Sequence, residues 1–143
     1  MGCINSVLMT ILRNIARSAS LSLALFLCGP AHAELVLSDM IYMIDGDTAK
    51  LGNQRYRLVG YDTPETWIPR CAFEKALGDA ASDRARELVS QAGMVDFVIL
   101  PGRDRYDRGL ASIYIRGIDL GEMLIREGLA RPYTGGKRGS WCE

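Results

Sequence analysis

The stretch FEKALGDAASDRARELVSQAGMVDFVI, residues 73–99, contains the change of hydrophobic period that decides the fold. Its first part repeats apolar residues every three or four positions, with charged residues between them. That spacing predicts an amphipathic helix over 73–92, which Gly93 ends and Gly78 weakens locally. Residues 95–99 then alternate between apolar and other side chains, a pattern typical of a strand. We therefore expect a long helix that runs directly into a strand.

Short β-prone segments precede this helix. Residues 35–43 are largely apolar and predict one strand. Residues 48–51 and 55–59 predict two further strands, and the Gly52-Asn53 pair between them is a favourable two-residue hairpin connection. Three strands are thus expected before the helix.

The segment after the helix predicts two strands and a second helix. Residues 101–107 read as a charged loop, and 110–115 as the fifth strand. Asp119 and Glu122 have the spacing of a capping box, which opens a short helix that Gly128 ends. The order predicts an α+β fold: a five-stranded, partly open OB-fold barrel with the long helix between strands 3 and 4 and a short C-terminal helix.

The first 33 residues have the features of a signal peptide. They contain no acidic residue, two arginines, a short apolar run and an Ala-His-Ala sequence at 31–33. We predict cleavage after Ala33, an exported protein that is periplasmic or secreted, no membrane attachment after cleavage, and one domain over 34–143. A retained anchor is the alternative, although the apolar run is short for a membrane span.

Removing this segment changes which chemistry is possible. Of the 17 basic residues, Arg13 and Arg17 leave with it, so 15 remain against 17 acidic ones. The absence of a basic excess argues against tight, salt-dependent binding to long nucleic acid. His32 is the only histidine, and its loss excludes Ser-His-Asp hydrolysis, histidine-based ribonuclease mechanisms and most zinc sites. Carboxylates, arginines, tyrosines and a hard metal ion are what remains.

Two cysteines, Cys71 and Cys142, remain in the mature chain. An even number in an exported protein predicts a disulfide bond. It would close a loop of about 70 residues and stabilise the fold by roughly 4 kcal/mol on the chain-entropy model. Two unpaired thiols are the alternative.

Polar residues cluster in three short segments, 44–48, 57–65 and 104–111, where the chain turns. Asp47 begins one predicted strand and Asp62 follows another, so pairing of those strands would bring the two carboxylates together. Oxygen ligands suit Ca²⁺ or Mg²⁺, and Ca²⁺ fits better because a small, irregular ligand set completed by water matches its loose geometry. Taken alone, an Asp-Gly-Asp-Thr sequence is more simply a solvated turn.

Glu65, Arg57 and Arg108 would complete a site that acts on phosphate. A loop carboxylate at Glu65 can accept a proton from an attacking water. The guanidinium groups of Arg57 and Arg108 can bind phosphate oxygens in bidentate fashion and stay charged. Each residue also has an ordinary interpretation, as a loop carboxylate, a strand arginine or part of a charged run.

Together these residues, with their flanking sequence and the five-residue step from Arg57 to Asp62, resemble the staphylococcal nuclease family. The resemblance extends from about Ile41 to Tyr133 in the same segment order. It implies an OB-fold enzyme that cleaves single-stranded DNA and RNA in the presence of Ca²⁺ and leaves 3′-phosphates. The implied roles are Ca²⁺ ligation by Asp47, Asp62 and the Thr63 carbonyl, action through bound water for Asp45, a general base in Glu65, and phosphate contacts from Arg57 and Arg108.

The resemblance also implies substrate contacts from Arg105, Tyr106 and Tyr133. The expected partner is single-stranded nucleic acid as substrate, with no stable protein partner and a monomeric protein.

The sequence departs from the family in three ways. Asp107 stands where the family has glycine before the second arginine, which places a negative charge beside Arg108. The chain ends soon after Tyr133, so the family's third helix is missing, and a Cys71–Cys142 bond would pin the tail in its place. The mature chain is mildly acidic. The competing hypothesis is a non-catalytic OB-fold module that binds oligonucleotides or an envelope partner.

Overall fold

The computed structural model describes residues 32–142, so the predicted signal peptide lies almost wholly outside the described residues. The elements in chain order are β1 (His32–Leu37), the 3-10 turn η1 (Ser38–Met40), β2 (Ile41–Asp45), β3 (Thr48–Leu51), β4 (Gln54–Leu58), β5 (Gly60–Asp62), α2 (Ala72–Ala92), β6 (Met94–Arg103), β7 (Gly109–Ile115), β8 (Ile118–Asp119), α3 (Leu120–Arg126) and β9 (Arg131–Tyr133). No helix within this range is both long enough and apolar enough to cross a bilayer.

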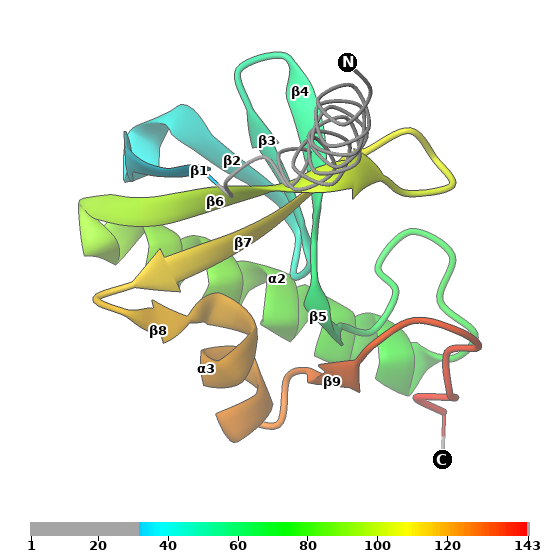
Figure 1. Ribbon diagram of the computed structural model, residues 1–143. Helices are drawn as coiled ribbons and strands as arrows, with labels where there is room; N and C mark the ends of the chain where they lie inside the picture. The colour runs from blue at the N-terminus through cyan, green and yellow to red at the C-terminus, as the bar shows by residue number, and fades with distance from the viewer. Residues whose placement is uncertain (1–31, 143) are drawn as a thin grey trace, which may run out of the picture. The chain divides into compact units, whose positions relative to one another are not determined.

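The strands form one curled sheet and a small second one (Figure 1). The order in the main sheet is β1-β6-β7-β4-β3-β2, and β8 pairs with β7. Neighbouring strands are antiparallel except β4 and β7, which are parallel. The second sheet pairs β5 with β9. The sheet forms a partly open barrel with α2 between β5 and β6, which confirms the α+β class and the OB-fold arrangement.

Local sequence patterns correctly predicted the long helix, one hairpin turn and one helix cap. The helix expected over 73–92 is α2, Ala72–Ala92, and the hairpin at Gly52-Asn53 joins β3 to β4 as expected. Half of the predicted capping box is present: the Asp119 side chain accepts a hydrogen bond from the backbone of Glu122, whereas the Glu122 side chain pairs with Arg126.

Two strand predictions were wrong in extent. The strand expected over 35–43 is interrupted by η1, because the Ser38-Asp39-Met40 segment turns and so separates β1 from β2. The loop expected from 101 to 107 is partly strand, because β6 continues through a register shift between Leu100 and Arg103. With β5, β8 and β9 as additional short strands, the described residues contain more than the five strands predicted.

One hydrophobic core lies between α2, α3 and the inner face of the sheet. Ala81, Ala85 and Val89 form the buried stripe of α2. Phe97 and Ile113 from β6 and β7 are fully buried in the same core. Each large side chain of this kind contributes about 1.5–3 kcal/mol through its burial. This core makes the sheet and α2 a rigid support for the loops that follow the strands.

A disulfide joins Cys71 to Cys142, as the cysteine count predicted. The Cα atoms are 6.0 Å apart, and the two residues are separated by 71 positions. Cys71 is also the N-cap of α2, where its Sγ accepts a hydrogen bond from the backbone of Glu74 at 3.4 Å. The bond therefore fastens the C-terminal tail to the start of the longest helix.

We expect the double replacement Cys71→Ser, Cys142→Ser to lower the free energy of unfolding by about 2–4 kcal/mol, because a long loop in the unfolded chain is no longer closed. Urea unfolding followed by circular dichroism measures this loss. Addition of reductant to the wild-type protein serves as the matched comparison. Equal midpoints for the double variant and the oxidised wild type would contradict a structural disulfide.

Candidate functional site

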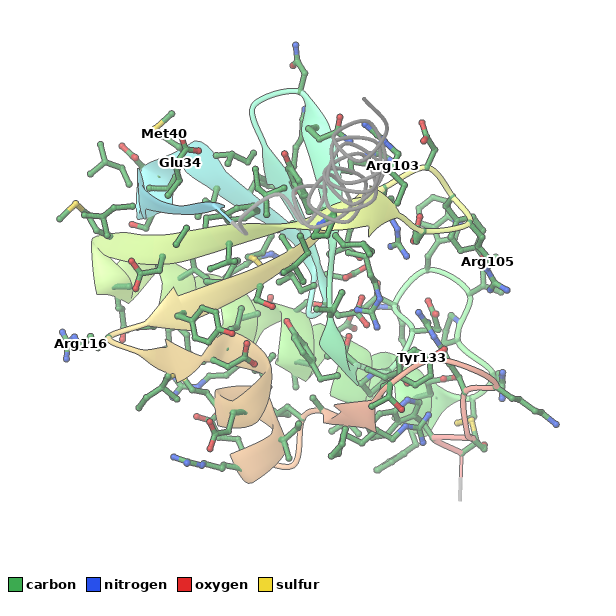
Figure 2. The ribbon with its side chains drawn as sticks, in the orientation of Figure 1. Glu34, Met40, Arg103, Arg105, Arg116 and Tyr133 are labelled. Atoms are coloured by element: carbon green, nitrogen blue, oxygen red, sulfur yellow. A yellow bond between two sulfur atoms is a disulfide. The ribbon has the colours of Figure 1, made fainter. Side chains whose placement is uncertain are left out.

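A cleft of about 1060 Å³ collects nearly all the site residues that the sequence predicted. Three segments border it: the β2–β3 turn, the β6–β7 loop and the C-terminal tail. Figure 2 shows Arg105 on the β6–β7 loop and Tyr133 at the end of β9, where the tail begins. The predicted residues that line the cleft are Asp45, Asp47, Arg57, Glu65, Arg105, Tyr106, Arg108 and Tyr133. Asp62 and Thr63 are buried.

The turn that carries Asp47 is locked against the strand that carries Asp62. A Cβ atom at Gly46 would lie only 2.7 Å from Thr63 Cγ2, so only glycine allows this approach without displacement. The Tyr61 hydroxyl donates to the Gly46 carbonyl at 2.9 Å. The backbone N–H of Thr63 donates to Asp47 Oδ2 at 3.2 Å. The convergence of the two segments that the sequence predicted is therefore present.

Arg57 is buried and connects the two carboxylates. Its Nη1 lies 2.7 Å from Asp47 Oδ2, and its Nη2 lies 3.9 Å from Asp62 Oδ1. It also donates to the backbone carbonyls of Asp47, Leu58 and Tyr61 at 2.7–3.0 Å. A guanidinium has five N–H donors, so donors remain that can face the cleft. Arg57 therefore holds the site together as well as lining it.

Burial raises the pKa of Asp47 from 3.8 to about 6, although the Arg57 guanidinium acts in the opposite direction. The Asp45 carboxylate adds to the rise, and its Oδ1 accepts a hydrogen bond from the backbone of Asp47 at 3.1 Å. At neutral pH the Asp47 carboxyl is mostly ionised.

The carboxylates fit a divalent cation that takes few protein ligands. Within residues 32–142 no three His, Cys, Asp or Glu side chains converge closely enough to hold a metal ion alone. Asp62 Oδ1, however, is buried and accepts no hydrogen bond of good geometry, although Arg138 Nε is 3.0 Å away. An unsatisfied buried carboxylate oxygen beside the partly desolvated Asp47 is suited to a hard cation. Backbone oxygen and water would supply the other ligands.

Arg108 is oriented by Asp104 and Thr48. Its Nε and Nη2 both lie 2.7 Å from Asp104 Oδ2, and its Nη1 donates to the Thr48 hydroxyl at 3.0 Å. Partial burial acts to raise the pKa of Asp104, but the hydrogen bonds from Arg108 and from the Tyr106 backbone outweigh it and hold that pKa below its usual value. An ionised Asp104 thus fixes the direction of Arg108.

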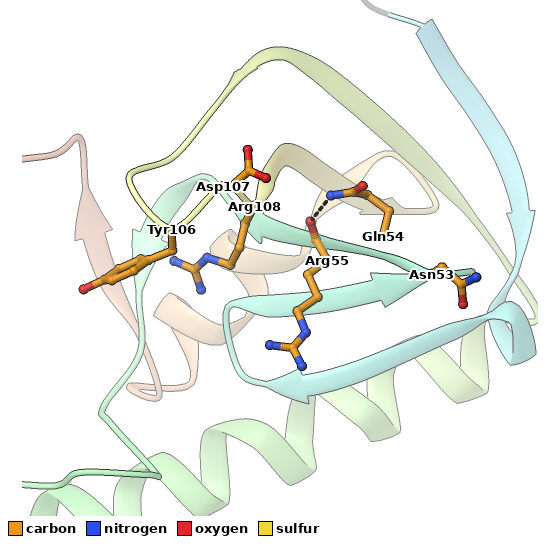
Figure 3. Close-up of a pocket in the computed structure, with 6 residues that line it drawn as sticks. All are labelled: Asn53, Gln54, Arg55, Tyr106, Asp107 and Arg108. Carbon is orange, nitrogen blue, oxygen red and sulfur yellow. Dashed lines mark hydrogen bonds between the residues drawn. The ribbon is translucent and has the colours of Figure 1, made fainter.

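Asp107 has the left-handed backbone expected where the family has glycine, with φ of 61°. Its carboxylate lies 3.4 Å from Arg103 and not against the guanidinium of Arg108, and Figure 3 shows it pointing away from that group. The negative charge of Asp107 is therefore directed away from the cleft, and Asp104, which the sequence analysis did not single out, is the acidic partner of Arg108.

Glu65 lies on the exposed loop between β5 and α2. A Cβ atom at Gly78 of α2 would lie 2.8 Å from the Pro64 carbonyl oxygen and 3.1 Å from that of Glu65. The loop therefore rests directly on the helix backbone, which explains a glycine that weakens the helix. The close approach determines where Glu65 stands relative to the cleft.

We expect Gly78→Ala to destabilise the protein by about 1–3 kcal/mol through overpacking, and to lower kcat by about tenfold because the Pro64-Glu65 backbone has to shift. Thermal unfolding and steady-state hydrolysis of oligonucleotides measure the two effects. Ser90→Ala on the exposed side of α2 is the control. An intrinsic helix preference for alanine would instead make Gly78→Ala more stable than the wild type.

Two tyrosines border the cleft, Tyr106 on the β6–β7 loop and Tyr133 at the end of β9. The guanidinium groups of Arg105 and Arg108 lie 4.8 and 5.5 Å from the centre of the Tyr106 ring. Across the cleft, the Tyr133 hydroxyl donates to the Gly136 carbonyl at 2.7 Å. Tyr106 is 64% exposed, so its ring is open to a ligand.

A second hollow of about 480 Å³ adjoins the cleft and shares Tyr106 and Arg108 with it (Figure 3). Asp107 also lines it, and its other side is formed by the β3–β4 hairpin, with Asn53, Gln54 and Arg55. The two hollows together make a path that passes Arg108 and continues along β4.

Two arginines of the site were missed by the sequence analysis. Arg131 Nη2 lies 3.2 Å from Asp62 Oδ2, and Arg138 Nε lies 3.0 Å from Asp62 Oδ1. Arg138 Nη1 also donates to Glu65 Oε1 at 2.5 Å. The basic residues after the last helix are not clearly denser than elsewhere in the chain, so only the folded tail shows which carboxylates they meet.

Comparison with known proteins gives a consistent result. The model of the family described as staphylococcal nuclease homologue matches residues 55–140. The chain is 40% identical over 105 residues to the SPbeta prophage-derived endonuclease YokF of Bacillus subtilis, covering 68% of this chain and 34% of that protein. It is 41% identical over 95 residues to endonuclease YncB of the same organism, covering 62% of this chain and 44% of that protein.

A thermonuclease from Staphylococcus hyicus is 35% identical over 107 residues, covering 72% of this chain and 63% of that protein. The matched region thus spans between about a third and just under two thirds of the length of these relatives.

Proposed function

The chain belongs to the family of staphylococcal nuclease homologues, and from this premise we propose that it is a calcium-dependent endonuclease that hydrolyses phosphodiester bonds. The single observation that carries the proposal is the composition of one cleft. The carboxylates of Asp47 and Glu65 line it together with Arg57 and Arg108. The fully buried Asp62, whose Oδ1 is unsatisfied, lies 3.9 Å from the same Arg57. A binding module has no need of a desolvated carboxylate pair.

Each residue of the cleft has a separate role in the proposed hydrolysis. Asp47 and Asp62, together with the Thr63 carbonyl, would hold Ca²⁺, and Asp45 would support the site through water. Bound Ca²⁺ supplies Lewis-acid stabilisation of negative charge on the phosphate.

Arg57 and Arg108 bind the non-bridging oxygens of the scissile phosphate, and their charge offsets the charge that builds up on five-coordinate phosphorus. Glu65 accepts the proton of the attacking water. The oxygen of that water bonds to phosphorus while the bond from phosphorus to the 5′ oxygen breaks. The 5′ oxygen takes a proton from solvent and leaves as a hydroxyl, and the other product keeps a 3′-phosphate.

Single-stranded DNA and RNA are the proposed substrates. Tyr106 and Tyr133 offer rings on which unpaired bases can stack, and Arg105 can contact a phosphate. The path past Arg108 toward Arg55 has room for a continuing strand, which favours a polymer over a small diester. The mildly acidic chain binds such a strand through local contacts and not through a strong overall positive charge.

We further propose that the protein is exported through its signal peptide, as a periplasmic or secreted monomer without a stable protein partner. The Cys71–Cys142 bond supports this destination, because disulfides persist in oxidising compartments.

End-group analysis tests the proposed function. The purified protein is incubated with a 5′-labelled single-stranded DNA and its RNA counterpart, in Ca²⁺ and in chelator. We expect internal cleavage only in Ca²⁺. Phosphatase treatment should lower the negative charge of the fragments, because they end in 3′-phosphate. Products with 3′-hydroxyl ends would contradict the reaction proposed. Binding of the oligonucleotide without any cleavage would favour the non-catalytic module.

A further inference from the structure

The C-terminal tail, residues 134–142, is anchored to the site from two directions. The disulfide fastens its end to the start of α2. Arg131 of β9 donates to the carbonyls of Gly139 and Ser140 at 2.7 and 3.1 Å. The same guanidinium lies 4.1 Å from the centre of the Trp141 ring. The tail thus has a defined course although it contains no helix or strand.

This course places the side chain of Arg138 between two carboxylates of the cleft. Its Nε is 3.0 Å from Asp62 Oδ1, and its Nη1 is 2.5 Å from Glu65 Oε1. The Nη1 contact is a hydrogen bond and sets the direction of the Glu65 carboxylate, whereas the Nε contact is an ion pair that keeps the planar guanidinium beside Asp62.

The two carboxylates differ in how firmly the rest of the fold holds them. The side chain of Asp62 is 1% exposed and also meets Arg131, so its place does not depend on Arg138 alone. The Glu65 side chain is 49% exposed, and within residues 32–142 Arg138 is its only side-chain ion-pair partner. A carboxylate on an exposed loop loses its orientation when its single partner is removed. The contact from Arg138 is therefore decisive for Glu65 and dispensable for Asp62.

We propose that Arg138 is a positioning residue, which holds the Glu65 carboxylate at a set place relative to Asp62. The disulfide-anchored tail places the Arg138 side chain beside these two carboxylates. The proposal rests on the proposed function, in which Glu65 accepts a proton and Asp62 holds the cation. On this proposal the nine-residue tail supports the loop that carries the general base, Glu65.

The alternative to positioning is competition between the Arg138 guanidinium and the divalent cation, and the experiment separates the two. A guanidinium beside Asp62 could act as a competitor that a divalent ion has to displace. Its removal would then strengthen Ca²⁺ binding and raise the rate. If Arg138 instead positions Glu65, its removal lowers the rate.

The test compares oxidised wild-type protein with Arg138→Gln and Arg138→Lys. Arg116→Gln is the matched control, because it removes the same charge from an exposed arginine at the β7–β8 turn, far from the cleft (Figure 2). Three quantities are measured: kcat and KM on a single-stranded oligonucleotide, Ca²⁺ affinity by calorimetry, and the position of the Glu65 carboxylate in crystal structures.

We expect Arg138→Gln to lower kcat by about 10–100-fold, the usual loss when a supporting partner of a site carboxylate is removed, with KM changed less than threefold. Arg138→Lys recovers part of kcat, since it keeps the charge without the planar fork. The Glu65 carboxylate keeps one position in the wild-type crystal and is shifted or disordered in Arg138→Gln, because within residues 32–142 Arg138 is its only side-chain ion-pair partner. Arg116→Gln matches the wild type in all three quantities.

A double-mutant cycle with Glu65→Gln ties the effect to its partner. Arg138→Gln should change kcat less than about twofold in the Glu65→Gln background, because no charged base is left to position. An undiminished loss in that background would overturn the proposal.

A raised kcat together with tighter Ca²⁺ binding in Arg138→Gln would also overturn it in favour of competition. If the wild type itself does not cleave, the proposed function fails. The crystal structures then decide the positioning contact alone, and an unchanged Glu65 carboxylate in Arg138→Gln would reject it.

Discussion

Glu65→Gln is expected to lower kcat by roughly 10²–10⁴-fold while leaving the fold intact, because the amide keeps the shape of the side chain but cannot accept the proton of water. The carboxylate is half exposed and its removal disturbs no buried contact, so stability should change little. Steady-state hydrolysis of single-stranded DNA at saturating Ca²⁺ measures the loss. KM should stay near its wild-type value, because Glu65 is not proposed to bind the phosphate.

Glu87→Gln is the control for this variant, since Glu87 lies on an exposed part of α2 and pairs only with surface side chains. It should retain wild-type kcat. A Glu65→Gln enzyme that kept more than about a tenth of the wild-type kcat would contradict a general-base role, because base catalysis is worth at least about 10²-fold.

Arg57→Gln is the second large effect, and it acts on both stability and rate. The buried guanidinium pairs with Asp47 and donates to three backbone carbonyls, so its loss leaves an unpaired buried charge and unsatisfied acceptors. Breaking a buried pair of this kind costs about 3–5 kcal/mol. The rate should fall by a further 10²–10³-fold or so under conditions where the variant is folded, since a phosphate contact is lost as well.

Urea unfolding and kcat/KM, measured below the unfolding transition, separate the two effects. Arg55→Gln is the control for stability, because Arg55 lies two residues earlier on the same strand and is exposed. Its free energy of unfolding should stay within about 0.5 kcal/mol of the wild type. An Arg57→Gln protein as stable as Arg55→Gln would show that the buried network contributes nothing, which our account excludes.

The sequence predicted the elements whose signals are local. The period of the helix over 73–92, the Gly52-Asn53 turn and the Asp119 cap each depend on residues close together in the chain, and each was confirmed. The break at 38–40 was missed although Ser38 and Asp39 are residues common in turns, because the apolar residues on both sides favour one continuous strand. The different partners of β1 and β2 reveal the turn.

The site shows the same division between local and distant information. Asp47, Asp62 and Arg57 were predicted together because each lies on or beside one of three short consecutive strands, and the structure joins them through one ion-paired arginine. Arg131 and Arg138 were missed because their partners are 69 and 76 positions away, respectively, with Arg138 placed by a tail that has no periodic pattern. Asp107 was suspected of opposing Arg108, whereas the left-handed turn directs it to Arg103.

The most direct test of the central claim is the initial rate of cleavage of denatured DNA as a function of free Ca²⁺, with wild type and Asp62→Asn in parallel. Asp62 contributes the unsatisfied buried oxygen on which the proposed cation site depends. We predict no cleavage in chelator, a saturable rise with Ca²⁺ for the wild type, and no such rise for Asp62→Asn. Equal rates in chelator and in Ca²⁺, or a full response from Asp62→Asn, would contradict a metal-dependent nuclease built on these carboxylates.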